Sequence, residues 1–391
     1  MTSKISFRNC APRRPMTRKA DTLTSAQIDV DRAWMRRALR LAGQGLGQVW
    51  PNPAVGCLIV DDTRCIGRGR TREGGRPHAE TIALQNTGAP ARGATAYVTL
   101  EPCSHHGKTP PCADALIEAG IARIVVAMRD PDPRVNGTGI SRLRDAGLDV
   151  VERVCADEAA DVNIGFLTRV RHGRPFVTLK LAMTLDGRIA MASGESRWIT
   201  DTPARRMTHM LRSMHDGIMV GRGTVQKDDP MLDVRGFGPV ANPVRIVVDT
   251  QAKTAPDSKL LRTTDTGPVW IATCGTTPSE GILDHPNVTQ IVTKTDQTGI
   301  IMTDLLQQLG TRGMTRVLCE GGGQIAASLL AADLVDELVI FHAGKMIGAS
   351  GLAAIAELSA QNLADVPQFN LVSTTPVAPD IVSVWRRSSE L

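Results

Sequence analysis

Apolar positions recur along this chain in two patterns that alternate with each other. In residues 31–44 they repeat every three to four positions, which predicts an amphipathic helix. Short apolar runs predict strands at 54–60, 94–100, 123–128 and 149–154. Further helices are predicted at 78–85, 111–119, 140–145 and 157–170, and a Gly/Arg-rich turn at 67–76. Strands that alternate with helices predict an α/β domain.

The alternation starts again after residue 175. The segment 171–175 is basic, contains a glycine and ends in proline, so we place a domain boundary there. Strands are predicted at 176–182, 217–220, 244–249, 269–273, 288–292, 316–319 and 337–341. Helices are predicted at 203–214, with Thr202 as the N-cap, and at 303–309 and 324–332. The chain therefore divides into two α/β domains with separate cores, 29–171 and 175–391.

Residues 1–28 differ in composition from the rest. The first 20 residues contain six basic side chains and no acid, whereas the whole chain has a net charge of +5, so the remainder sums to −1. We expect a disordered basic tail on a nearly neutral body, with a short organellar targeting segment as the alternative. Aromatic residues make up only 3% of the chain, with a single tyrosine, which argues against a nucleic-acid partner.

Hydropathy and the number of cysteines bear on whether the protein enters a membrane and whether it contains disulfides. The sequence contains neither an apolar stretch long enough to cross a bilayer nor a secretory signal, so we expect no membrane partner and a cytoplasmic location. The eight cysteines are few and scattered, which favours metal ligands over disulfides.

The first chemical constellation combines His78 and Glu80 with Cys103 and Cys112. One imidazole and two thiolates suit a zinc ion that keeps its fourth position open for water, and such water ionises near neutral pH to a nucleophilic hydroxide. Glu80 can then carry the proton from that water to a leaving amine. His-x-Glu followed by Pro-Cys and a second cysteine is a known signature of zinc-dependent base deaminases. A closed structural zinc site, or core cysteines beside a capping glutamate, is the alternative.

The second half carries weaker signals. Gly321–Gly323 lie between a predicted strand and a helix, where backbone amides and a helix N-terminus can bind a dinucleotide phosphate, although a flexible turn explains them as well. Arg212 and Arg235 suit a sugar phosphate, or are solvated surface arginines. Asp186 is a candidate catalytic acid or part of an Asp-Gly turn.

Several strings resemble one family, the bifunctional riboflavin-biosynthesis deaminase/reductases. Its deaminase domain is similar to Pro51–Gly56 (PNPAVG), His78–Glu80 (HAE) and Glu101–Cys112 (EPCSHHGKTPPC), in which eight residues separate the two cysteines. Its reductase domain is similar to residues 179–190, 193–200, 221–230 and 317–324. The resemblance spans about residues 29–390. It implies a three-layer α/β/α domain like that of cytidine deaminases, followed by an α/β domain like dihydrofolate reductase.

The resemblance also implies an activity. The first domain would deaminate a diaminopyrimidinone ribosyl phosphate with Zn²⁺, and the second would reduce the ribosyl group of the product to ribityl with NADPH, in a homo-oligomer. By resemblance, the substrate contacts are Asn52, His105 and Lys108 in the first domain and Ser196, Arg212, Leu232, Arg235 and Glu320 in the second. The NADPH contacts are Ala182, Trp198, Thr224, Asp228, Thr250, Gly322, Gly323, Gln324, Ile325, Ala326, Ala327 and Ser328. Thr71 stands where many members carry a histidine that is thought to contact the substrate.

Two other functions remain as rivals. A nucleoside or tRNA deaminase with an unrelated second domain is disfavoured by the long spacing between Cys103 and Cys112 and by the lack of a basic, aromatic surface. A binding module with a structural zinc and an inactive reductase half is a rival from another class, which replacement of Glu80 would test.

Overall fold

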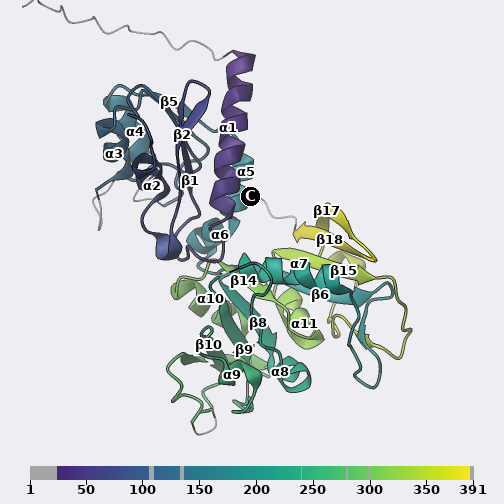
Figure 1. The fold of residues 1–391 in the computed structure, drawn as a ribbon. Coiled ribbons are helices and arrows are strands. Elements are labelled where there is room, and N and C mark those ends of the chain that lie inside the picture. Colours follow the sequence, from purple (N-terminus) through teal and green to yellow (C-terminus); the bar gives the residue numbers. More distant parts are fainter. Residues whose placement is uncertain are drawn as a thin grey trace, which may run out of the picture.

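The computed structural model describes residues 24–104, 110–132, 136–238, 240–278, 281–297 and 299–387. The chain forms one sheet of five strands and one of nine, each with its own helices (Figure 1). The two α/β halves predicted from the sequence are therefore present. Helix α6 (Ile164–His172) ends the first half and strand β6 (Phe176–Thr184) begins the second, and the assignment of domain limits at 171 and 175 stays a prediction.

The first sheet has the order β2-β1-β3-β4-β5. Its strands are β1 (Gly56–Asp61), β2 (Arg64–Arg70), β3 (Thr95–Val98), β4 (Arg123–Val126) and β5 (Asp149–Glu152). Strand β1 runs antiparallel to both of its neighbours, whereas β3, β4 and β5 are parallel. The helices are α1 (Ser25–Gly43), α2 (Ala79–Gln85), α3 (Cys112–Glu118), α4 (Thr138–Asp145), α5 (Ala156–Val162) and α6, with a 3-10 turn at Glu73–Gly75.

Both faces of this sheet are buried. Successive side chains of a strand point to opposite faces, and in β1 Cys57 and Ile59 pack with α2, α3 and α4 while Leu58 and Val60 pack with α1 and α5. The result is the three-layer α/β/α arrangement that the sequence predicted (Figure 1).

The Gly/Arg-rich turn predicted at 67–76 is wrong for its first part, because Arg64–Arg70 form strand β2. The glycines there allow close packing rather than a turn. A Cβ atom on Gly69 would lie 2.2 Å from the carbonyl oxygen of Ala79, and one on Gly67 would lie 2.4 Å from that of Ala83. Strand β2 and helix α2 can therefore approach each other only because both positions are glycine.

Two helix predictions also need correction. Helix α1 begins at Ser25, with the Thr24 hydroxyl accepting from the Gln27 amide, so residues 25–28 are helical and are not part of the tail. The helix predicted at 157–170 is divided into α5 and α6 at Asn163. The buried Asn163 side chain bonds both the amide and the carbonyl of Ala54, and this tertiary contact occupies the position where the helix is interrupted.

The second sheet has the order β11-β10-β9-β8-β14-β6-β15-β18-β17. Its other strands are β8 (Gly217–Gly221), β9 (Val244–Val248), β10 (Val269–Thr273), β11 (Val288–Val292), β14 (Arg316–Cys319), β15 (Glu337–Ala343), β17 (Phe369–Val377) and β18 (Asp380–Arg387). The helices are α7 (Thr202–Ser213), α8 (Arg222–Asp228), α9 (Lys259–Arg262), α10 (Met302–Thr311) and α11 (Gly323–Ala331). Two separate two-stranded sheets pair β7 (Arg188–Ala190) with β16 (Leu352–Ala353) and β12 (Thr295–Asp296) with β13 (Gly299–Ile300), and a 3-10 turn lies at Leu363–Asp365.

Seven strands of this sheet, from β11 to β15, are parallel, and helices cover both faces. Helices α10 and α11 pack with Met219 of β8, whereas α8 and α9 pack with Ile218 and Val220 of the same strand. The apolar pattern did not predict the antiparallel pair β17 and β18 or helix α8. The N-cap of α7 is Asp201 rather than the predicted Thr202, because the Asp201 carboxylate accepts from the Thr202 amide.

The two halves contact each other directly. The Arg316 guanidinium of β14 donates to the backbone carbonyls of Asp161 (3.2 Å) and Val162 (3.1 Å), and Arg386 pairs with the Asp161 carboxylate. A Cβ atom on Gly47 would lie 2.5 Å from the carbonyl oxygen of Ser213. Within the ranges given above, no helix is long and apolar enough to span a membrane.

Candidate functional sites

Three side chains from separate elements meet in the first half. His78 lies at the N-cap of α2, Cys112 begins α3, and Cys103 lies in the loop after β3. The His78 Nδ1 atom is 3.2 Å from the Cys112 Sγ and 3.6 Å from the Cys103 Sγ. All three potential ligand atoms lie within 4.8 Å of one another. One nitrogen and two sulfur ligands at this spacing fit a zinc ion with an open fourth position.

Glu80 lies beside these ligands in the first turn of α2. Its side chain is 4% exposed, and burial raises the pKa of the carboxyl group to about 7. A carboxyl group with this pKa can both accept and donate a proton near neutral pH, which suits a general acid–base.

The two thiols have different electrostatic environments. A hydrogen bond with Cys112 lowers the pKa of Cys103 to about 4 in spite of its burial, and the same contact raises the pKa of Cys112. The backbone amide of Cys112 also donates to the Cys103 sulfur at 3.4 Å. The fold therefore supports a thiolate at Cys103, the form in which cysteine binds metal.

Glu101, two residues before Cys103, holds the loop that carries this ligand. Its buried carboxylate accepts hydrogen bonds from four backbone amides, those of Asp130, Gly137, Gly139 and Ile140, at 2.9–3.3 Å. This carboxylate ties the end of β3 to the start of α4. The sequence analysis did not single out Glu101, although an acidic residue directly after an apolar strand was a signal for it.

The predicted substrate contacts of the first half are only partly visible. Asn52 donates to the carbonyl of Gly74 at 3.1 Å, in the turn that precedes His78. Thr71 is buried, and its hydroxyl contacts the backbone of Val55. His105 and Lys108 lie outside the described residues.

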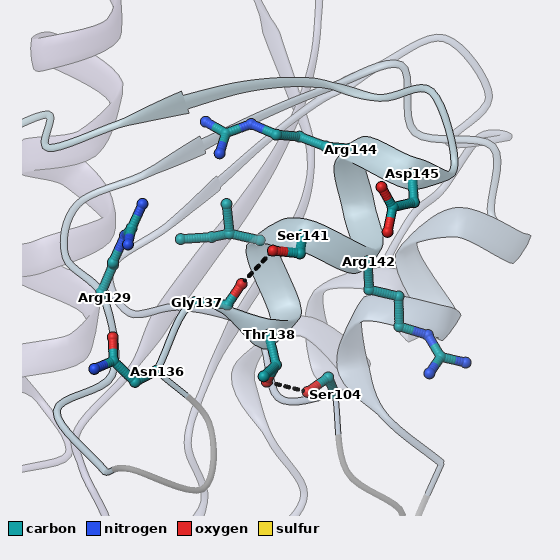
Figure 2. A pocket seen from close by; sticks show the side chains of 10 residues that line it. Ser104, Arg129, Asn136, Gly137, Thr138, Ser141, Arg142, Arg144 and Asp145 are labelled. Atoms are coloured by element: carbon teal, nitrogen blue, oxygen red, sulfur yellow. Dashed lines mark hydrogen bonds between the residues drawn. The ribbon is translucent and has the colours of Figure 1, made fainter.

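A pocket of about 670 Å³ lies next to Ser104 and the start of α4 (Figure 2). Three arginines line it, but each already has a carboxylate partner. Arg129 and Arg144 pair with Glu152, and Arg142 pairs with Asp114. The positive charge of these three arginines is therefore already balanced by carboxylates, so the pocket is a weaker anion site than three unpaired arginines would make.

In the second half, the predicted cofactor contacts gather at one edge of the sheet. Ala182, Thr250 and the segment Gly322–Ser328 lie at or after the carboxyl ends of β6, β9 and β14, and Thr224 and Asp228 lie on α8, which follows β8. A Cβ atom on Gly322 would lie 3.8 Å from the Thr224 hydroxyl, so these two positions face each other. Carboxyl ends of parallel strands are the usual place for a dinucleotide in such sheets, and α11 directs its N-terminus there.

Some of the predicted cofactor and substrate contacts of the second half have side chains that a ligand cannot reach. Ala326 and Ala327 are buried, so they can contact a ligand only through their backbone. Leu232 packs in the core, so the same holds for it. Trp198 is 62% exposed, with the Arg205 guanidinium over its ring at 4.5 Å. Ser196 is half-buried in the same loop.

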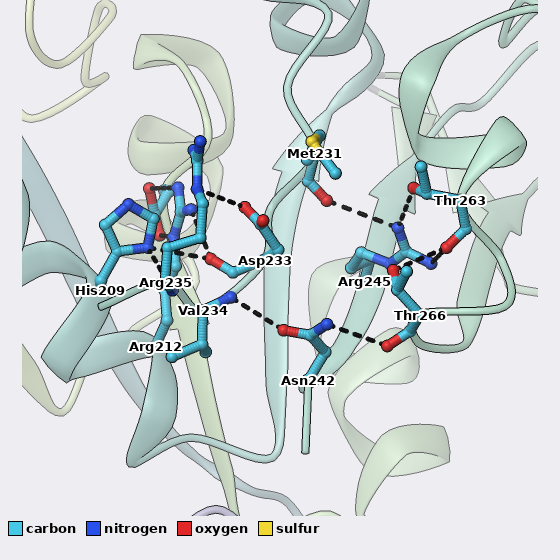
Figure 3. A network of polar contacts seen from close by, with 11 residues as sticks. His209, Arg212, Met231, Asp233, Val234, Arg235, Asn242, Arg245, Thr263 and Thr266 are labelled. Atoms are coloured by element: carbon cyan, nitrogen blue, oxygen red, sulfur yellow. Dashed lines mark hydrogen bonds and ion pairs between the residues drawn. The ribbon is translucent and has the colours of Figure 1, made fainter. Parts of the chain in front are cut away.

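Arg212 and Glu320 form a buried bidentate pair. Arg212 belongs to a wider polar network that also contains Asp233 and Arg235 (Figure 3). Arg212 donates from Nε and Nη2 to the two carboxylate oxygens at 2.6 and 2.9 Å, and from Nη1 to the carbonyl of Asp233. Burial alone would raise the pKa of Glu320, but the Arg212 guanidinium keeps it below the usual value. Arg212 is thus committed to Glu320, whereas the Arg235 side chain is largely exposed, with its Nε 3.2 Å from the Asp233 carboxylate.

The loop that carries Leu232 and Arg235 is fixed from its other side by Arg245 (Figure 3). This buried arginine of β9 donates to the carbonyls of Met231 and Thr263 and to the Thr263 hydroxyl. Leu232 adopts a φ of +53°, an unfavourable conformation for a leucine that this surrounding network maintains.

Lys180 is a functional candidate that the sequence analysis missed. It lies in β6, next to the strand that precedes Glu320, and is half-buried. Burial lowers the pKa of its ammonium group, and the Glu320 carboxylate opposes that effect. A lysine within the apolar run 176–182 was the available signal. Asp186, in contrast, accepts from the amides of Ile347 and Gly348 and from the Thr184 hydroxyl, which fits a turn.

Comparison with known proteins covers both halves. Residues 28–128 match the family model of the cytidine and deoxycytidylate deaminase zinc-binding region, and residues 175–383 match that of the RibD C-terminal domain. The first matched range contains His78, Cys103 and Cys112, and the second contains Arg212 and Glu320.

Full-length relatives agree with this division. The riboflavin biosynthesis protein RibD of Escherichia coli is 43% identical, over 90% of this chain and 98% of its own, and that of Aquifex aeolicus is 36% identical, over 92% and 99%. Among solved structures, Acinetobacter baumannii RibD is 37% identical with a TM-score of 0.83, covering 93% of this chain and 100% of its own. A diaminohydroxyphosphoribosylaminopyrimidine deaminase/5-amino-6-(5-phosphoribosylamino)uracil reductase of Thermotoga maritima is 35% identical with a TM-score of 0.82, covering 92% and 99%. The chain belongs to the RibD family of riboflavin biosynthesis proteins, which combine a deaminase and a reductase domain.

Proposed function

We propose that Glu80, with the ligands His78, Cys103 and Cys112, performs the deamination, and that the site around Glu320 performs the reduction. As a RibD protein, the chain is a bifunctional deaminase and NADPH-dependent reductase of riboflavin biosynthesis. The observation that carries the assignment of residues is the buried Glu80 carboxyl, with a pKa of about 7, beside three ligands within 4.8 Å of one another.

In the deaminase half, His78, Cys103 and Cys112 would hold a zinc ion, which would supply a water that ionises near neutral pH. The Glu80 carboxyl group beside them would accept a proton and pass it first to the ring nitrogen and then to the leaving amine. Because Glu80 is buried, bulk water has little access to its carboxyl group. Asn52, which bonds the turn before His78, is the candidate for orienting the pyrimidine.

In the reductase half, NADPH would supply a hydride to the sugar carbon when bound. The glycines at 321–323 and the Thr224 hydroxyl, which face each other at the carboxyl edge of the sheet, would hold it there. Lys180 lies beside Glu320 with a lowered pKa, so it can give up a proton to a sugar oxygen while Arg212 keeps Glu320 ionised and in place. The exposed Arg235 is the better candidate for the sugar phosphate.

Product analysis tests this assignment. Purified zinc-loaded protein is given the diaminopyrimidinone ribosyl phosphate with and without NADPH. We expect deaminated product without NADPH, and deaminated and reduced product with it. The variant Glu80→Gln must lose the first step and still reduce substrate that has already been deaminated. Unchanged deamination in this variant would remove Glu80 from the mechanism. The homo-oligomeric state and the cytoplasmic location stay predictions.

A further inference from the structure

A short segment of the deaminase half, residues 47–52, is seated on the reductase half. It follows the C-terminal end of α1, which points toward that half (Figure 1). A Cβ atom on Gly47 would lie 2.5 Å from the carbonyl oxygen of Ser213, the last residue of α7, and 3.1 Å from that of His215. Backbone therefore packs directly on backbone where the two halves meet.

Trp50 and Pro51 anchor the middle of this segment. Trp50 is half-buried and packs against the apolar core of the reductase half, the cluster that contains Met314 and Val317. Pro51 lies against Gly313, in the loop between α10 and β14. A Cβ atom on Gly313 would lie 2.8 Å from the Pro51 Cβ and 3.7 Å from the Cε3 atom of Trp50. The position of the segment therefore depends on the reductase half.

The same segment holds the turn that precedes the potential metal ligand His78. The Gln48 carbonyl accepts from the Gly74 amide at 3.0 Å, and the Asn52 Nδ2 atom donates to the Gly74 carbonyl at 3.1 Å. A Cβ atom on Gly75 would lie 2.0 Å from the Asn52 Nδ2, so the Asn52 amide packs directly on this glycine. A shift of the segment would therefore move both Asn52 and the turn before His78.

Asn52 bonds the protein with one end of its amide and leaves the other end to a ligand. Its Nδ2 atom donates to the carbonyls of Gly74 and Val49, at 3.1 and 3.4 Å. Its Oδ1 atom accepts no hydrogen bond from the residues that the structure describes. The segment thus fixes the direction of an acceptor that suits an N–H donor, such as an amino group on a pyrimidine ring.

The deaminase half also contacts the middle of the segment. The Arg169 guanidinium of α6 donates to the Pro51 carbonyl at 2.9 Å, in an exposed position. Exposed hydrogen bonds contribute little net free energy, because water competes for both partners. The apolar contacts of Trp50 and Pro51 with the reductase half remove surface from water, so we expect these contacts to set the position of the segment.

We infer that Trp50 is a positioning residue for deamination, and that the reductase half, through its contacts with Trp50 and Pro51, holds Asn52 in place for the substrate of the other half. The inference rests on the proposed contact between Asn52 and the pyrimidine. Trp50 acts through the backbone that it anchors, two residues before Asn52. The deaminase site is then complete only when both halves are packed together.

Kinetics of the first step test this inference on the zinc-loaded full chain without NADPH. Gly313→Ala places a methyl group 2.8 Å from the Pro51 Cβ, although Gly313 belongs to the other half. We expect the KM for the diaminopyrimidinone ribosyl phosphate to rise about fivefold to tenfold, the scale of one hydrogen bond, with little change in kcat or zinc content. Gly281→Ala is the matched control, because its φ of +82° is similar to the +99° of Gly313 but no atom lies within 4 Å of a Cβ there.

Trp50→Ala approaches the same contact from the deaminase side. It removes the ring that packs on the reductase core, so the KM for deamination should rise by a similar factor. Trp50→Phe keeps an aromatic ring at this position and should restore most of the wild-type KM. Reduction of pre-deaminated substrate should keep its KM and kcat in both variants, because Trp50 is not among the contacts proposed for that reaction.

Hydrogen exchange adds a readout that mere attachment of the two halves would not change. The Gly74 amide bonds the Gln48 carbonyl, so its protection should fall in Gly313→Ala and Trp50→Ala and stay at the wild-type level in Gly281→Ala. A Trp50 that only joins the two halves would lower Tm when it is replaced and leave this amide protected, and that result would overturn the inference.

Asn52→Ala separates the inference from the proposed contact on which it rests. If Asn52→Ala raises the KM for deamination while Gly313→Ala and Trp50→Ala keep the wild-type value, the substrate contact stands and the positioning role is overturned. If Asn52→Ala keeps the wild-type KM, the contact itself is overturned, and the inference with it. A higher KM in all three variants, with Gly281→Ala unchanged, supports both. Should Trp50→Ala fail to fold, Gly313→Ala against its control decides the question.

Discussion

The deaminase and reductase sites of this protein are built in opposite ways. The proposed deaminase ligands and Glu80 lie on two short segments, 78–80 and 103–112, and a few packed elements bring the three potential ligand atoms within 4.8 Å of one another. The proposed reductase site takes residues from positions 180 to 328, and only the order of the parallel strands brings them to one edge. A metal site can thus be recognised from local spacing, whereas a nucleotide site depends on topology.

The two sites also differ in how their charges are balanced. Glu80 is buried beside thiol groups and has no salt bridge to an arginine or lysine among the residues that the structure describes, and burial raises its pKa to about 7. Glu320 is buried as well, but Arg212 neutralises it through two hydrogen bonds. One carboxyl group is therefore prepared to exchange protons, and the other is held ionised. The predictions below test this contrast.

The largest effect is expected for Glu80→Gln. The amide keeps the size of the side chain but cannot accept the proton, so the rate of deamination should fall by about 10²–10⁴-fold. Zinc content, measured on the purified variant, and reduction of pre-deaminated substrate should stay at wild-type levels. Loss of zinc together with activity would instead indicate that Glu80 supports the ligands.

Arg212→Met should affect stability rather than proton transfer. It leaves the Glu320 carboxylate, 9% exposed, buried without its partner, which typically costs about 3–5 kcal/mol of unfolding free energy. Reductase activity should be lost, and zinc content should not change. Arg36→Met is the matched control, because the Arg36–Glu158 pair is exposed on both sides and its removal should leave the denaturation midpoint unchanged. Equal midpoints for both variants would contradict the role of Arg212.

A smaller effect, about 3 kcal/mol, is expected from pH. Burial lowers the pKa of His215 to about 4, compared with about 6.5 in the unfolded chain. Above pH 6.5 the residue is neutral in both states. As the pH falls towards 4, only the unfolded chain takes up the proton, so the folded state loses stability over this window.

The measurement compares the unfolding free energy of wild type and His215→Asn between pH 7.5 and 4. The difference between the two proteins should shrink by about 3 kcal/mol as the medium becomes acidic. Parallel curves would show that His215 does not contribute. Titration of the metal ligands affects both proteins equally and cancels in the difference.

The sequence predicted most of the fold and most of the deaminase site, for physical reasons. Alternating strands and helices have strong apolar periods, and strands such as Val269–Thr273 and Val288–Val292 were located to the residue. The three potential metal ligands and Glu80 lie in short motifs with fixed spacing, so they can be found without knowing which distant residues contact each other. The reductase half was harder. Lys180 becomes a candidate only because its strand, β6, pairs with β14, the strand that directly precedes Glu320.

The predicted turn at 67–76 was wrong for a reason of the same kind. Glycine usually indicates a turn in a sequence, but Gly67 and Gly69 are strand residues that make room for helix α2. That requirement depends on a contact between elements, so the composition of the segment could not show it. Asn163, which interrupts a predicted helix by bonding Ala54 across 109 positions, is a second example.

Gly69→Ala, with the smallest expected effect, tests whether this packing supports the metal site. The added Cβ would lie 2.2 Å from the Ala79 carbonyl oxygen, so α2, with His78 and Glu80 at its start, has to shift. We expect a loss of about 1–3 kcal/mol in unfolding free energy and weaker zinc binding in a chelator competition. Gly88→Ala is the control, because no atom lies within 4 Å of a Cβ there. If Gly69→Ala kept wild-type zinc affinity, the ligands would be positioned by the Cys103–Cys112 loop and Glu101 rather than by α2, and the deaminase site would also depend on distant contacts.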